Sequence, residues 1–197
     1  MPDTKRPLRL AATAALAALP LLAAAHTGAD AGAHHGFAAG LLHPLTGADH
    51  LAAMLAVGVW SALAARRPRD LLWAPLGFAA MLLAGALAGR AGLALPAVEP
   101  MIAASLLVIG LLAATRLHLP GPVAAVLVGT FALFHGIAHG TELAGTAAIA
   151  GMVLATALLH GAGIAIGWLL RERAAALPRL AGAAVALFGA TLLLRLA

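Results

Sequence analysis

The chain has 197 residues, of which 63% are hydrophobic and only 10% are charged, with a formal net charge of +5. The mean hydropathy of +1.01 lies far outside the range of water-soluble domains and indicates an integral membrane protein. Because the sequence has no cysteine, disulfides, thiolate zinc sites and iron–sulfur clusters are excluded. The arginines cluster between apolar segments, a pattern that orients a membrane protein, so we predict no nucleic-acid partner.

The first segment has the pattern of a secretory signal. Three basic residues precede an apolar run from Leu10 to Leu22, which is followed by three alanines. We therefore predict a cleaved signal peptide over residues 1–25 and a mature chain that begins at His26. The alternative is an uncleaved first helix.

Six further apolar stretches come close to the roughly 20 residues that a helix needs to cross a bilayer. They are residues 36–64, 71–89, 100–115, 121–143, 144–170 and 178–196. The loops between them are too short for a soluble domain, so residues 26–197 are predicted to form one all-α domain, a polytopic bundle of six transmembrane helices. Glycines at G-x3-G spacing in the second, fourth and fifth stretches indicate closely packed helices.

The distribution of arginines predicts how the bundle sits in the membrane. Seven arginines follow the first, third and fifth stretches, whereas Arg90 and Arg195 lie near the opposite side. By the positive-inside rule, the mature N-terminus and the C-terminus are predicted to be periplasmic in a bacterial inner membrane. The first and fourth helices carry paired histidines and run in opposite directions, which hints at two inverted halves of three helices.

The fourth stretch contains the sequence FALFHGIAHGTEL, with His135, His139 and Glu142 at i, i+4 and i+7. On a helix these three side chains fall within about 60° of one another. Two imidazoles at this spacing can bind one metal ion, and the carboxylate can ligate the ion or accept a proton. The alternative is an interhelical hydrogen-bond cluster, but three ionisable groups in an apolar helix are costly and favour a functional site.

The first stretch contains HPLTGADH, which carries a second set of polar groups. On an ideal helix His43 and His50 share a face, and Asp49 points about 100° to the side of His50. Pro44 removes a backbone hydrogen bond and Gly47 loosens the turn, so a bend can bring Asp49 and His50 into one site. Alternatively, Asp49 fixes the tautomer of a ligating histidine.

The remaining histidines extend this set along the membrane normal. From the expected helix ends, His43 and His139 lie near the outer surface, while His50 and His160 lie about 20 Å deep. Such a ladder favours permeation, because a single catalytic centre needs its ligands at one depth. His26 would offer an amine and a ring nitrogen for capture of an ion, and the alternative is a solvated tail. Thiol-free, imidazole-rich sites suit Ni²⁺, Co²⁺, Zn²⁺ or Cu²⁺ rather than Mg²⁺ or Ca²⁺.

At these residues the sequence resembles the HupE/UreJ family of nickel and cobalt permeases. The resemblance rests on HPLTGADH, on FHGIAHGTE and on the predicted His at the mature N-terminus, and it spans essentially the whole chain. It implies secondary uptake of Ni²⁺ or Co²⁺ as a transported substrate, with no permanently bound cofactor. The residues that it implies for the metal path are His43, Asp49, His50, His135, His139 and Glu142. The broader nickel-permease group has His-x4-Asp-His, whereas five residues separate His43 from Asp49 here, so the two motifs are not equated.

We therefore predict a secondary transporter and not an enzyme, with a divalent metal ion and the lipid bilayer as its partners. The sequence has no phosphate-binding Gly-rich loop, so the ion gradient or coupled protons must drive uptake. The alternatives are an intramembrane metalloenzyme and a metal-sensing accessory membrane protein that use the same histidines. Known routes of intramembrane proteolysis are disfavoured, because the sequence has neither His-Glu-x-x-His nor Gly-x-Ser-x-Gly.

Overall fold

The computed structural model describes residues 34–172 and 176–197, and helices make up nearly all of this part of the chain. In chain order the elements are β1 (His34–His35), α2 (Phe37–Thr46), α3 (Ala48–Ala64), η2 (Pro68–Leu72), α4 (Trp73–Arg90), α5 (Val98–Thr115), α6 (Gly121–Glu142), β2 (Leu143–Ala144), α7 (Thr146–Arg171) and α8 (Ala176–Leu196). Five helices are long and apolar enough to cross a membrane, and the bent pair of α2 and α3 makes a sixth span if counted as one. The predicted all-α membrane bundle is confirmed, while the predicted signal peptide and His26 lie outside the described residues.

The first span is broken rather than gently bent. The axes of α2 and α3 meet at 86°, and Gly47 between them has an extended backbone with φ −93° and ψ 114°. Pro44 lies inside α2 and cannot donate a backbone hydrogen bond, so the helix is weakened just before this point. The expectation that His43 and His50 share one helix face is therefore wrong, because the two residues belong to different helices.

Two short strands fix the start of α2 against the start of α7. β1 pairs in parallel with β2, with His34 opposite Leu143 and His35 opposite Ala144. Each strand is followed by a glycine with positive φ, Gly36 at 91° and Gly145 at 95°, and then by a helix. This backbone pairing brings the segment before α2 next to the end of α6, although no strand was expected from the sequence.

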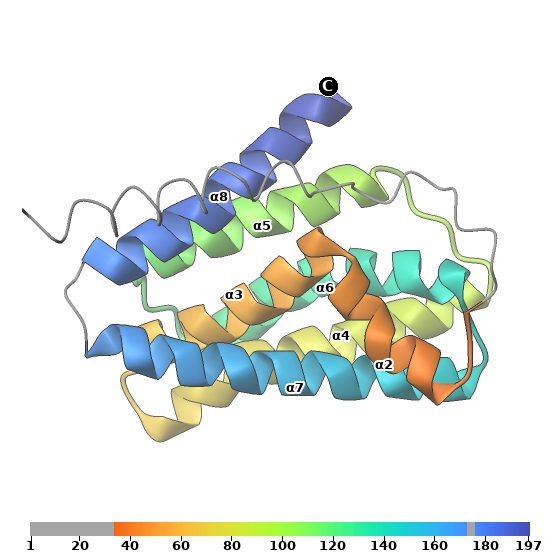
Figure 1. The fold of residues 1–197 in the computed structure, drawn as a ribbon, viewed down its shortest axis with the longest axis horizontal. Helices are drawn as coiled ribbons and strands as arrows, with labels where there is room; N and C mark the ends of the chain where they lie inside the picture. Colours follow the sequence, from red (N-terminus) through yellow and green to blue (C-terminus); the bar gives the residue numbers. More distant parts are fainter. Residues whose placement is uncertain (1–33, 173–175) are drawn as a thin grey trace, which may run out of the picture.

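The spans associate as three helix pairs, and Figure 1 shows α5 beside α8 in the upper part of the view, with α7 below. The most extensive contacts join α4 with α6, α5 with α8, and the broken span α2–α3 with α7. In chain order of the six spans, the first pairs with the fifth, the second with the fourth, and the third with the sixth. Exchanging the first half for the second half, span by span, leaves this set of pairs unchanged. The pairing therefore has the pattern expected for two inverted halves.

Glycines allow all three pairs to pack backbone against backbone, and in the α5–α8 pair a Cβ atom at Gly110 would overlap the backbone nitrogen of Ala186. A Cβ atom at Gly136 of α6 would overlap the carbonyl oxygen of Leu82 on α4, and one at Gly85 would overlap that of Leu133 on α6. In the α3–α7 pair, a Cβ atom at Gly163 would likewise overlap the carbonyl oxygen of Leu55. The G-x3-G segments thus serve helix packing, as the sequence predicts.

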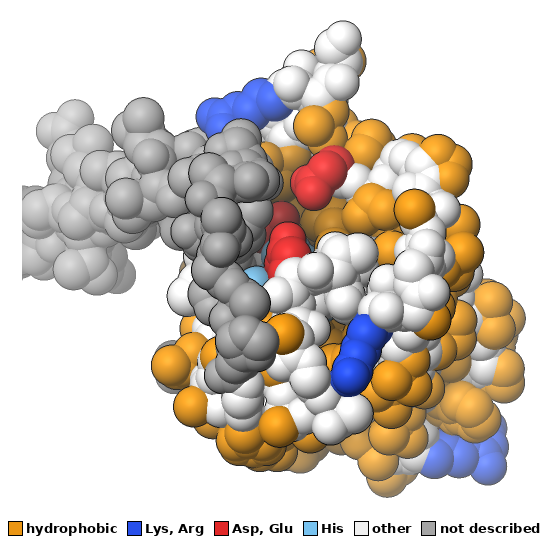
Figure 2. Space-filling model, turned by 90° about the vertical axis from the view of Figure 1, so that its right-hand side faces the viewer, with side chains coloured by type: hydrophobic (Ala, Val, Ile, Leu, Met, Phe, Trp, Pro, Cys, Tyr) orange, Lys and Arg blue, Asp and Glu red, His pale blue; other side chains and the backbone are white. Residues whose placement is uncertain are grey.

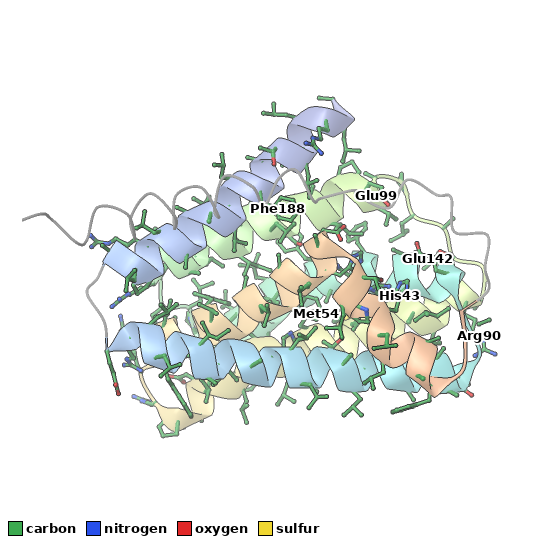
Figure 3. All side chains as sticks on the ribbon, in the orientation of Figure 1. His43, Met54, Arg90, Glu99, Glu142 and Phe188 are labelled. Atoms are coloured by element: carbon green, nitrogen blue, oxygen red, sulfur yellow. The ribbon has the colours of Figure 1, made fainter. Side chains whose placement is uncertain are left out.

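The two ends of the bundle differ in charge. One end carries Glu99, at the start of α5, and Glu142, at the end of α6, and we call it the acidic end (Figure 3). The opposite end carries η2, the 116–120 connection and the C-terminus of α7, with most of the arginines, and we call it the arginine-rich end. Within residues 34–172 and 176–197, the arginine-rich connections thus lie on one side, as the sequence predicts.

We predict that Gly136→Ala destabilises the bundle by about 1–3 kcal/mol, because the added methyl group forces α4 and α6 apart. The matched control is Gly161→Ala in α7, where a Cβ atom meets nothing within 4 Å. Thermal unfolding of both purified variants in detergent measures the difference. Equal stability of the two variants would contradict the close α4–α6 packing.

Candidate metal centre

A cluster of ligand-type side chains lies where the broken span meets the end of α6. His43, in the last turn of α2, has its Nε2 atom 3.0 Å from Oε2 of Glu142. One ligand atom from each of His43, His139 and Glu142 lies within 4.8 Å of the others, and we call these three residues the triad. The side chain of His43 is 6% exposed, whereas that of Glu142 is 45% exposed. The triad is therefore open on the Glu142 side and buried on the histidine side.

The acidic end presents this triad to the outside. In Figure 2, which faces this end, acidic side chains gather near the middle of the surface, with a histidine recessed beside them and basic side chains farther out. Figure 3 shows His43 on α2 and Glu142 on α6 converging at this end. A cation that approaches the bundle from this side meets carboxylates first, which favours its entry.

Four imidazole rings from three helices form a continuous chain inward from the triad. The ring centroids of His43 and His139 are 4.8 Å apart, those of His139 and His50 are 4.3 Å apart, and those of His50 and His135 are 5.1 Å apart. All four residues are buried. The predicted depths are wrong for His50, which lies beside His139 rather than well below it, because the break at Gly47 starts a new helix near the acidic end.

The carboxylate of Asp49 accepts hydrogen bonds from His50 and orients its ring. The Oδ1 atom of Asp49 lies 2.9 Å from both the backbone nitrogen and Nδ1 of His50. An ionised carboxylate only accepts hydrogen bonds, so Nδ1 donates, and in the neutral ring Nε2 carries the lone pair. Nε2 is buried and has no hydrogen-bond partner among the described residues. Of the two roles considered for Asp49, this geometry matches the one that fixes the tautomer of a ligating histidine.

Ser105 of α5 holds His135 in a comparable way. Its hydroxyl donates to the Ile102 carbonyl oxygen at 2.6 Å, so it can only accept from Nε2 of His135, which lies 3.0 Å away. The lone pair of His135 is therefore on Nδ1, which is buried without a hydrogen-bond partner in the described part of the chain. Asp49 and Ser105 thus leave one unsatisfied acceptor nitrogen on each of two neighbouring rings. A cation bound at either ring would satisfy the nitrogen of that ring.

Phe78 separates the last histidine from this cluster. Its ring centroid lies 5.7 Å from that of His135 and 5.2 Å from that of His160. His160 is 3% exposed, and its Nε2 atom has no hydrogen-bond partner among the described residues. Of the predicted site residues that the structure describes, His160 is therefore the one set apart, beyond an aromatic ring.

Three residues at the site were missed by the sequence analysis. Phe78 lies in a stretch without ionisable groups, so no local signal marks it. Ser105 is the one serine in the third apolar stretch, and that polar residue in an apolar helix was an available signal. Glu99 and Asp49 help to line a cavity of about 50 Å³ between α3, α5 and α8, which brings a further carboxylate to the acidic end.

The fold and the site define a multi-pass membrane protein with buried imidazoles and an exposed carboxylate in a cluster that could hold a metal ion. Residues 14–192 match the family described as HupE / UreJ protein. The chain is also 42% identical over 191 residues to Protein HupE of Rhizobium leguminosarum bv. viciae, a match that covers 94% of this chain and 97% of the relative. No solved structure matches the chain. The chain belongs to the HupE/UreJ family, which is associated with nickel and cobalt uptake.

We predict that Ser105→Ala weakens Ni²⁺ binding by about tenfold, because the His135 ring loses the acceptor that fixes its tautomer. The control is Thr115→Ala on the same helix, since the exposed Thr115 hydroxyl bonds only to carbonyl oxygens of its own helix. Calorimetric titration of both detergent-purified variants with Ni²⁺ gives the affinities. An unchanged affinity in Ser105→Ala would exclude this orienting role.

Proposed function

We propose that the protein is a secondary transporter that takes up divalent transition-metal ions, Ni²⁺ or Co²⁺ or both, across the cytoplasmic membrane. The observation that carries the proposal is the convergence of His43, His50, His135 and His139 on one buried chain of rings that begins at an exposed carboxylate. Each of these side chains is costly in an apolar interior unless a partner compensates for its lost hydration. The family's association with nickel and cobalt uptake supports the same function.

The spacing of the ligands favours passage of an ion over its permanent retention. Successive imidazole rings lie 4.3 to 5.1 Å apart, so an ion can exchange one nitrogen ligand for the next in short steps. Conduction requires sites that bind well enough to admit the ion and weakly enough to release it. We therefore assign the protein transport rather than catalysis, and we assign it no permanently bound cofactor.

The chemistry of the donors favours borderline metal ions. Imidazole nitrogens with one or two carboxylates suit Ni²⁺ and Co²⁺, whereas Mg²⁺ and Ca²⁺ prefer shells of oxygen. A metal ion binds only an imidazole nitrogen that carries no proton, so protons and metal compete for the same atoms. This competition offers a direct way to couple uptake to protons.

The charge of the two ends supports an orientation in the bacterial inner membrane. The acidic end, with Glu99 and Glu142, would face the periplasm, and the arginine-rich end would face the cytoplasm. The C-terminus lies toward the acidic end in Figure 1 and would be periplasmic. We also propose that residues 1–25 are a cleaved signal and that His26, the new N-terminus, captures ions on the periplasmic side.

We predict that Glu142→Gln and His139→Ala each reduce uptake of radiolabelled Ni²⁺ by more than about tenfold, because each removes one ligand of the triad. The control is Glu172→Gln, which removes an exposed carboxylate at the arginine-rich end. Cells that express each variant are compared with an empty-vector strain and with the parent chain, at matched abundance in the membrane.

Two results of this assay would count against the proposal. If the parent chain accumulates neither Ni²⁺ nor Co²⁺ above the empty-vector strain, the protein is not a permease for these ions. If the parent chain transports and both triad variants retain full uptake, the triad is not on the path of the ion.

A further inference from the structure

A second polar cavity lies at the arginine-rich end of the bundle, far from the triad. It has a volume of about 20 Å³, which is room for one water molecule or one ion. The polar residues that line it are Ser61 at the end of α3, Asp70 in η2 and His118 in the 116–120 connection. Three separate segments thus bring an imidazole, a carboxylate and a hydroxyl to one small enclosure.

His118 and Asp70 each direct an acceptor atom toward this site, and Ser61 adds an unpartnered hydroxyl. Nδ1 of His118 lies 3.0 Å from the Ala64 carbonyl oxygen, which can only accept, so Nδ1 carries the proton and Nε2 carries the lone pair. The Asp70 carboxylate is held by the backbone N–H of Arg67, which donates to Oδ2 at 3.0 Å. The Ser61 Oγ atom is buried and has no hydrogen-bond partner in the part of the chain that the structure describes.

This cavity lies on the same helices as the imidazole chain. Along α3, Ser61 follows His50 by eleven residues, and along α6, Ala124 precedes His135 by eleven residues. Both separations correspond to about 16 Å along a helix axis. Ala74, also in the lining, precedes Phe78 by one turn of α4. The cavity is therefore in line with the four rings, on the far side of Phe78 and His160.

The surrounding charge makes this cavity a weak site for cations. Arg66 and Arg67, just before η2, and Arg69, within it, are exposed, and Arg116 precedes His118 by two residues. At the acidic end, by contrast, Glu99 and Asp49 line one cavity and add carboxylates to that of Glu142. The affinity for a divalent ion is therefore lower at the arginine-rich end, and a low affinity is what a release site requires.

We infer that the cavity formed by Ser61, Asp70 and His118 is a second divalent-metal site, from which the ion leaves toward the arginine-rich side. His118 Nε2 and the Asp70 carboxylate supply the main ligands, and the Ser61 hydroxyl oxygen completes the set. This inference rests on the proposed transport function, and it adds a release site that is separate from the triad.

Trp60 provides a probe of this site, because it lines the cavity and is 2% exposed. The other two tryptophans, Trp73 and Trp168, are 43% and 54% exposed, so both can be changed to Phe to leave Trp60 as the single emitter. Ni²⁺ and Co²⁺ quench indole emission steeply with distance. His50 of the imidazole chain lies ten residues from Trp60 on α3, about 15 Å away along the axis.

The experiment is a titration of this full-length single-tryptophan protein with NiCl₂ in detergent, followed by Trp60 emission. We expect saturable quenching. His118→Asn keeps an N–H near the position of Nδ1 but removes Nε2, and we expect it to raise the half-quenching concentration by at least about tenfold. Asp70→Asn should raise it as well, whereas His43→Ala, in the distant triad, should leave it unchanged.

The possible results separate this site from the transport function. Quenching that is absent, or that is unchanged in both His118→Asn and Asp70→Asn, would mean that the cavity holds only water and would overturn the inference. Quenching lost in His43→Ala would assign the signal to the triad and would also overturn it. Failure of cellular Ni²⁺ uptake would remove the transport function by a different assay, since quenching in detergent reports binding alone.

Discussion

The site depends on the break in the first span. If α2 and α3 were one straight helix, His43 and His50 would lie about 10 Å apart along it, and both could not contact His139. The extended backbone at Gly47 and the 86° turn allow His43 to reach Glu142 from α2 while His50 reaches His139 from α3. Pro44 and Gly47, which weaken a transmembrane helix, are therefore as necessary to the cluster as the histidines themselves.

Much of the fold follows from the sequence because apolar length and arginine position are local properties. The approximate extents of the last five spans, the glycine packing and the segregation of the described arginines were predictable on that basis, whereas the break of the first span into two helices was not. Most of the site residues were also predictable, because ionisable side chains stand out in apolar helices. The approach of rings from different helices, such as His50 and His139, depends on the break and on helix pairing, which a single sequence does not encode locally. The same limit applies to Phe78, whose role is defined only by the two rings on either side of it.

The orienting groups illustrate a second limit. The sequence places Asp49 next to His50 but does not distinguish a metal ligand from a group that orients His50, because the two roles differ only in the direction of the carboxylate. The structure places its oxygen against Nδ1, which leaves Nε2 as the nitrogen with a lone pair. Ser105 does the same for His135 from a helix far away in the sequence. Hydrogen-bond accounting in three dimensions therefore identifies which ring nitrogen is available to a ligand, whereas sequence spacing identifies only the candidate residues.

The backbone-to-backbone contacts of the α3–α7 and α4–α6 pairs leave little freedom within either pair, so each pair can be regarded as one rigid unit. His50 and His160 belong to the α3–α7 unit, with His43 on the attached α2, and His135, His139 and Phe78 belong to the α4–α6 unit. Every step from one ring to the next along the chain His43–His139–His50–His135 crosses the interface between the two units. A slight slide of one unit past the other would therefore alter all of these ring spacings at once, as shear motions of packed helices do.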